Sequence, residues 1–120
     1  MNFEKFIAKF EEKISLERIY DMQKISEGQT IPLPPSKTSK DLTITIDENT
    51  KGYLLSRPGN IKFEIFISKK TFASPEIWVF KRTGEFIGES KFHIIEDALN
   101  WMIETSIIDS ELRQKQIKTI

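Results

Sequence analysis

The chain has 120 residues, enough for a single domain with one hydrophobic core. Its 18 Lys and Arg residues balance 18 Asp and Glu residues, so no net charge attracts it to nucleic acid or to an anionic membrane. It has no cysteine and one histidine, His93, which excludes disulfides, thiolate nucleophiles, Cys-based metal sites and any pair of histidine ligands within the chain.

Two helices are expected at the N-terminal end. One apolar stripe at helical spacing predicts a helix over residues 3–14, and a second stripe on roughly the opposite face predicts another helix, or a kinked continuation, over residues 16–26. Gly28 is a suitable C-terminal stop. The stripes consist of Phe3, Phe6, Ile7, Phe10 and Ile14, and of Leu16, Ile19 and Tyr20.

A proline-rich connector follows over residues 29–41. Three prolines within four positions disfavour a helix and favour extended polyproline geometry. The stretch from Pro32 to Lys37 fits the loose PxxPx(Lys/Arg) pattern that SH3-type grooves bind. The alternative is a stiff connector that carries the chain to the next element, with Ile31 and Leu33 tucked into the core.

An antiparallel sheet is expected over residues 42–92. Runs of alternating apolar and polar residues are separated by turns of two to seven residues, which are too short for the crossovers that parallel neighbours need. The pattern therefore predicts a meander of four to five strands. The expected strands cover residues 42–46, 53–57, 61–68, 76–82 and 85–88, the last with an extension to residue 92.

Helical spacing returns in the last third of the chain. It predicts a helix over residues 94–106, and Ile107 and Ile108 are expected to pack as the chain leaves that helix. A final short helix over residues 110–118 is polar, so we expect it to fray. The stripe of the longer helix consists of Ile95, Ala98, Leu99, Met102 and Ile103.

The order of these elements predicts one α+β domain spanning residues 1–120. A single antiparallel meander sheet of four to five strands would carry the N-terminal and C-terminal helices mainly on one face. In the strand at 61–68, the alternation places four large apolar residues on that face and mixed residues on the other. The expected core residues of this strand are Ile61, Phe63, Ile65 and Ile67.

The other face of the sheet combines aromatic and charged residues, as protein interfaces do. One interpretation is a surface for a partner protein or for a second copy of the chain. The alternative is that its aromatic rings pack under the second helix or the connector, so that both faces of the sheet are covered. The candidate partner-binding residues on this face are Lys62, Glu64, Phe66, Trp78, Phe80 and Arg82.

Residues 51–91 form a locally basic region, with 8 basic and 4 acidic residues. A basic sheet with aromatic rings could bind single-stranded nucleic acid by stacking and phosphate contacts. The alternative is a solvated sheet edge, where lysines also prevent aggregation. No RNP-type motif supports nucleic-acid binding, and the neutral whole chain argues against it.

No catalytic motif is present. The sequence lacks a phosphate-binding loop, a dinucleotide fingerprint, a nucleophile elbow and zinc-ligand spacing. His93 could act as an acid or base, or it could cap the helix that follows it or lie in solvent. We therefore expect a protein that is not an enzyme and that uses no cofactor or metal.

The hypothesis from sequence is a small protein-binding domain that occludes its partner, as toxin-neutralising immunity proteins of bacteria and phage-type inhibitors do. The alternatives are a domain associated with single-stranded nucleic acid and a homodimeric subunit of a larger complex. Charged residues interrupt the first ten positions, and apolar runs are short, so no signal peptide or membrane span is expected. We expect a soluble, cytoplasmic protein.

Overall fold

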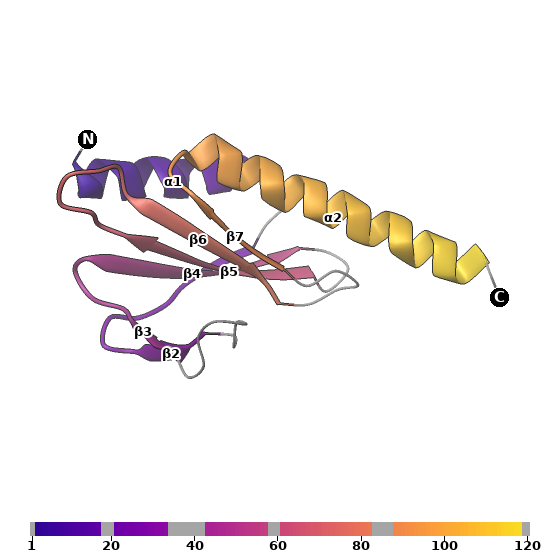
Figure 1. Cartoon of the computed structure of the whole chain (residues 1–120), viewed down its shortest axis with the longest axis horizontal. Coiled ribbons are helices and arrows are strands. Elements are labelled where there is room, and N and C mark those ends of the chain that lie inside the picture. The colour runs from indigo at the N-terminus through magenta and orange to yellow at the C-terminus, as the bar shows by residue number, and fades with distance from the viewer. Residues whose placement is uncertain (1, 18–20, 34–42, 58–60, 83–87, 119–120) are drawn as a thin grey trace.

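The computed structural model describes residues 2–17, 21–33, 43–57, 61–82 and 88–118. It confirms the α+β class: two helices lie above a five-stranded antiparallel sheet, and a second sheet of two strands lies below it (Figure 1). The helices are α1 (Phe3–Glu17) and α2 (Ile95–Lys118). The strands are β1 (Asp21–Lys24), β2 (Thr30–Pro32), β3 (Thr43–Thr45), β4 (Thr50–Arg57), β5 (Ile61–Ser68), β6 (Glu76–Lys81) and β7 (Gly88–Phe92).

The main sheet has the order β1-β4-β5-β6-β7, and all its pairs are antiparallel. Strands β4 to β7 are neighbours in chain order, which is the predicted meander. The prediction for residues 61–68 matches β5, whereas β4 begins at Thr50, before the expected residue 53. The described part of the last strand is β7, and the predicted stretch 85–87 lies outside the described residues.

The predicted helix over residues 16–26 is wrong. Helix α1 continues to Glu17, and the chain then returns as β1 along the free edge of β4, pairing Asp21 with Ser56 and Lys24 with Tyr53. Leu16, the start of the supposed second stripe, is 69% exposed. Pairing with a distant strand thus outweighs a local helical pattern that has no surface to pack against. Residues 18–20 lie outside the described residues.

The connector is not a simple spacer, and the prediction of a single sheet is wrong. Its residues Thr30–Pro32 form β2, which pairs with β3, so the strand expected at 42–46 belongs to a second sheet. The hydroxyl oxygens of Thr30 and Thr45 lie 3.1 Å apart across this pair. The Pro-rich residues 34–41 lie outside the described residues, so the SH3-ligand interpretation stays a prediction.

The two predicted C-terminal helices form one helix, α2. No Gly or Pro stands between residues 106 and 110 to end a helix there, and α2 runs past the end of the sheet (Figure 1). Ile107 and Ile108 are 50% and 45% exposed, so the expectation that they pack is also wrong. Within the described chain, neither helix has a stretch long and apolar enough to cross a membrane.

One core lies between the helices and the main sheet. Both helices cover the same face, as predicted (Figure 1). Phe63 and Ile65 of β5 are fully buried beneath them. The ring centroids of Phe10 and Tyr53 lie 5.1 Å apart, which joins α1 to β4. The helical contributions to this core are Phe3, Phe6, Phe10 and Ile14 from α1, and Ile95, Ala98, Leu99 and Met102 from α2.

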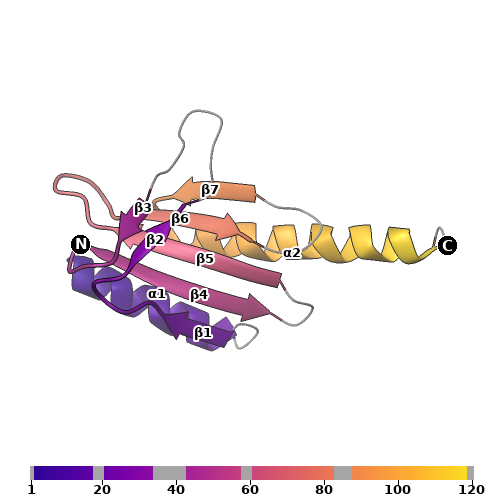
Figure 2. The same cartoon turned by 90° about the horizontal axis from the view of Figure 1, so that it is seen from below.

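A second core lies on the opposite face of the sheet. Residues 25–33 and 43–46, which we call the flap, cross this face of the sheet (Figure 2). They cover Phe66 and Phe80, which are 0% and 4% exposed. The predicted exposure of these two rings is therefore wrong. The alternative, in which the connector covers them, is confirmed, and the flap side chains that pack on the rings are Ile25, Ile31, Leu33, Ile44 and Ile46.

Backbone hydrogen bonds fasten the flap to itself and to the sheet. The N–H of Ile25 donates to the carbonyl of Gly52 at 2.9 Å, and the N–H of Gly28 donates to the carbonyl of Ile46 at 2.8 Å. Gly28 has a φ of 90°, a conformation that side chains strongly disfavour, and it lies in the turn that precedes β2 within the flap. The flap therefore has a defined position on the sheet.

Gly52 of β4 allows this close approach. A Cβ added there would lie 2.8 Å from Cδ1 of Ile46 and 3.0 Å from Cδ1 of Ile25, closer than van der Waals contact. The absence of a side chain at position 52 thus lets two isoleucines of the flap rest directly on the strand.

We predict that Gly52→Ala destabilises the protein by about 1–3 kcal/mol, because its methyl group overpacks the flap. Ile46→Val removes the nearest methyl group, and alone it should cost about 0.5–1.5 kcal/mol. The double variant should lose less than the sum of the two, which urea denaturation of all four proteins would measure. Strict additivity would show that Gly52 and Ile46 do not contact one another.

Candidate functional site

The structure divides the six sequence-predicted residues into three groups. Lys62, Glu64 and Arg82 lie together on a part of the sheet face that the flap leaves uncovered, with Lys62 exposed and the other two half-buried. Phe66 and Phe80 are buried beneath the flap, and Trp78 is half-buried beside them. Only the first group and Trp78 can touch another molecule without movement of the flap.

The aromatic residues of β6 form a stack with a cation at each end. Trp78 and Phe80, two positions apart on one face, have ring centroids 6.3 Å apart and planes inclined by 12°. The ammonium of Lys91 lies 5.4 Å from the centroid of Trp78, and the guanidinium of Arg82 lies 5.5 Å from that of Phe80. The indole N–H of Trp78 donates to Glu76 at 2.6 Å, which fixes the ring.

Arg82 is held by an ion pair in addition to this stacking. Its Nη2 donates to Oε2 of Glu64 at 2.7 Å, and both side chains are less than one-third exposed. Its backbone N–H donates to the carbonyl of Lys62 at 2.9 Å, which extends the pairing of β6 with β5 by one residue. These contacts hold the guanidinium in one orientation.

These charged residues surround an apolar centre that the sequence analysis missed. Leu54 of β4 is 37% exposed, and the strand register places it beside Glu64. With Lys62 and Arg82, both residues line a depression of about 270 Å³, which we call the uncovered patch. The sequence signal for the exposed leucine was the pair Leu54-Leu55. Neighbouring residues of a strand point to opposite faces of the sheet, so only one of the two leucines can lie in the helix-side core.

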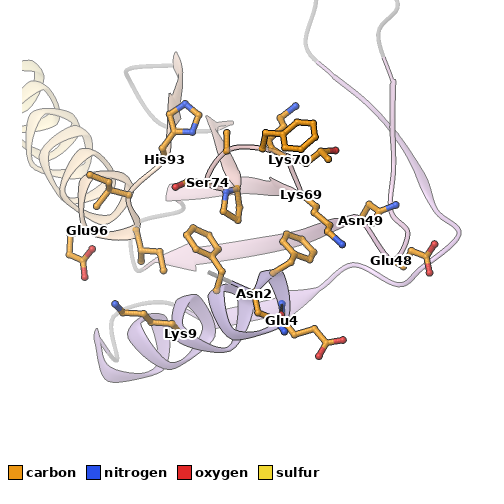
Figure 3. A pocket seen from close by; sticks show the side chains of 18 residues that line it. Asn2, Glu4, Lys9, Glu48, Asn49, Lys69, Lys70, Ser74, His93 and Glu96 are labelled. Atoms are coloured by element: carbon orange, nitrogen blue, oxygen red, sulfur yellow. Dashed lines mark hydrogen bonds between the residues drawn. The ribbon is translucent and has the colours of Figure 1, made fainter.

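A larger open cleft of about 1250 Å³ lies at the end of the sheet where β5 stops, and we call it the end cleft (Figure 3). The starts of α1 and α2, the turn from β3 to β4 and the loop over residues 69–75 form its walls. Phe72 in that loop is 100% exposed, and Ile94 before α2 is 56% exposed. The sequence signal for Phe72 was a large apolar residue in an otherwise small and polar loop.

Charges of both signs surround the end cleft. Glu96 is paired with Lys13 at 2.8 Å, and this hydrogen bond lowers the pKa of the Glu96 carboxyl. By contrast, Glu4, Glu48 and Lys69 have no ion-pair partner within the described part of the chain. His93 lies exposed in the wall of the cleft.

The described residues contain no cluster of three or more His, Asp or Glu side chains that could hold a metal ion. Phe66 and Phe80 are buried, so two of the three rings on which nucleic-acid bases were expected to stack are inaccessible to a ligand. The same burial makes these two rings inaccessible to a second copy of the chain that would bind the aromatic face.

Compared with known proteins, the chain matches no family model, no curated protein and no solved structure.

We predict that the Glu96 carboxyl titrates below the ordinary pKa of a glutamate, and that Lys13→Gln raises its pKa, because the variant removes the largest cause of the shift. A lowered folded-state pKa contributes stability above the ordinary pKa, and this is lost as the pH falls through the lowered pKa. Carboxyl-detected NMR titration would measure the shift, with Lys5→Gln as the control. An unchanged Glu96 pKa in Lys13→Gln would contradict the assignment.

Proposed function

We propose that the chain is a protein-binding domain that covers part of a partner protein's surface, with the uncovered patch at the centre of the contact. The observation that carries the proposal is the exposed Leu54, surrounded by Lys62, Glu64 and Arg82 on a rigid sheet. An apolar centre with a charged rim is the arrangement of protein interfaces. Occlusion of this kind is how immunity proteins and phage-type inhibitors act, and we place the chain in that class.

Arg82 is suited to contribute most of the binding energy. Arginine is enriched among the residues that dominate interface energetics. The contacts with Glu64 and Phe80 already restrict this side chain, so binding loses little of its conformational entropy. The buried rings of Phe66 and Phe80 thus support the contact surface from below and do not form it.

The charges of the patch favour a protein over a nucleic acid as the partner. Lys62 and Arg82 are balanced by Glu64 and by Asp21, which lines the same depression. With two carboxylates balancing two cations, the patch has no net positive charge with which to bind the phosphates of a polyanion. A partner surface that itself carries both signs of charge fits this pattern better.

The test is partner capture with matched surface variants. Leu54→Ser removes the apolar centre of the patch, whereas Leu16→Ser changes a leucine that is 69% exposed on α1. We expect Leu54→Ser to weaken capture from a host lysate by about tenfold or more, and Leu16→Ser to leave it unchanged. The captured protein is then identified, purified and titrated against all three proteins, and its activity should be blocked at equal stoichiometry.

Two outcomes would remove the proposal. One is equal affinity of the partner for wild type and for Leu54→Ser, with both variants shown to be folded by circular dichroism. The other is binding of a labelled single-stranded oligonucleotide at low salt that Leu54→Ser abolishes, because the patch would then serve the nucleic-acid alternative.

A further inference from the structure

The loop over residues 69–75 carries a fully exposed phenylalanine between two anchored ends. The N–H of Lys69 donates to the carbonyl of Asn49 at 2.8 Å, and Pro75 at the other end is buried. The ammonium of Lys70 lies 3.9 Å from a carboxylate oxygen of Glu76. The loop is thus anchored on both sides, while the ring of Phe72 between the anchors is 100% exposed.

A protrusion and a hollow therefore lie next to each other at one end of the molecule. Phe72 is among the residues that line the end cleft, whose volume of about 1250 Å³ has room for an aromatic side chain. Ile94, directly before α2, also lines the cleft and is 56% exposed. Surfaces on which large apolar groups stay exposed commonly mark interaction sites.

The unpaired charges of this region are also of both signs. Lys69 lies on the anchored loop, and Glu48 lies in the turn from β3 to β4, directly before the Asn49 that holds that loop. Neither side chain has an ion-pair partner within the described residues. A surface with adjacent positive and negative groups becomes complementary to itself when a two-fold axis passes between them.

The geometry points to a second copy of this chain as the occupant of the end cleft. Two copies meet end to end across a two-fold axis, and each Phe72 enters the end cleft of the other copy. Lys69 of each copy then faces Glu48 of its partner copy, which forms two equivalent ion pairs. Such an isologous contact is the commonest form of self-association among soluble proteins.

This interface differs from the uncovered patch in place and in chemistry. The patch lies at the start of β5, around Lys62 and Glu64, whereas the end cleft lies beyond Ser68, where β5 ends. The lysines of the cleft are balanced by an equal number of glutamates, so no net charge attracts a polyanion such as an anionic membrane or a nucleic acid. The charged lining residues are Lys9, Lys69 and Lys70, and Glu4, Glu48 and Glu96. The two proposals can therefore fail independently.

The first test is the oligomeric state of the full chain by sedimentation equilibrium over a wide range of concentrations. We expect a monomer–dimer equilibrium, and Phe72→Ser should raise the dissociation constant by about thirtyfold or more, as loss of a central interface residue does. Leu16→Ser is the matched control and should leave it unchanged. A wild-type protein that stays monomeric at every concentration overturns the inference, as does a dimer that Phe72→Ser does not weaken.

The second test is a charge exchange that identifies the facing pair. Lys69→Glu and Glu48→Lys each place like charges across the two-fold axis, so each variant alone should dimerise about tenfold or more weakly than wild type. Mixed in equal amounts, the two variants restore opposite charges at both ion pairs and should form a heterodimer. Failure of the mixture to associate overturns the pairing, and Phe72-dependent binding of anionic vesicles by a monomeric chain assigns the cleft to a membrane instead.

Discussion

The structure depends on one constraint: strands β5 and β6 carry large apolar side chains on both faces of the sheet. Phe63 and Ile65 require a cover on one side of β5, and Phe66 requires one on the other. Two helices supply the first cover. The second comes from the flap, a segment too short to build another helical layer, which reaches the sheet closely because Gly52 has no side chain.

The flap covers only part of its face, and this incomplete cover gives the molecule its proposed contact surface. Where the flap is absent, the residues of β5 and β6 change from aromatic to charged, so that face can contact water. The transition occurs at Arg82, whose guanidinium lies over the ring of Phe80 and also pairs with Glu64. The same packing that stabilises the second core therefore orients the side chain on which we expect binding to depend.

The period-two alternation of the strands predicted the meander and the helix-side core, because that pattern is local. It could not show that β1 pairs with β4, or that Ile31 and Ile44 lie over Phe66, because those contacts join segments distant in the chain. It likewise assigned Phe66 and Phe80 to a contact surface, since a strand sequence does not show what lies above each face. The end cleft escaped prediction because four separate segments build it.

The separation of the two proposed surfaces has a consequence for binding strength. Because the uncovered patch and the end cleft lie at opposite ends of β5, self-association through the cleft would leave both patches of the pair accessible. A pair of this kind would offer two contact sites to a partner that is itself repeated or symmetric. The second contact would then be intramolecular, and avidity could exceed the affinity of one patch without any new contact in the structure.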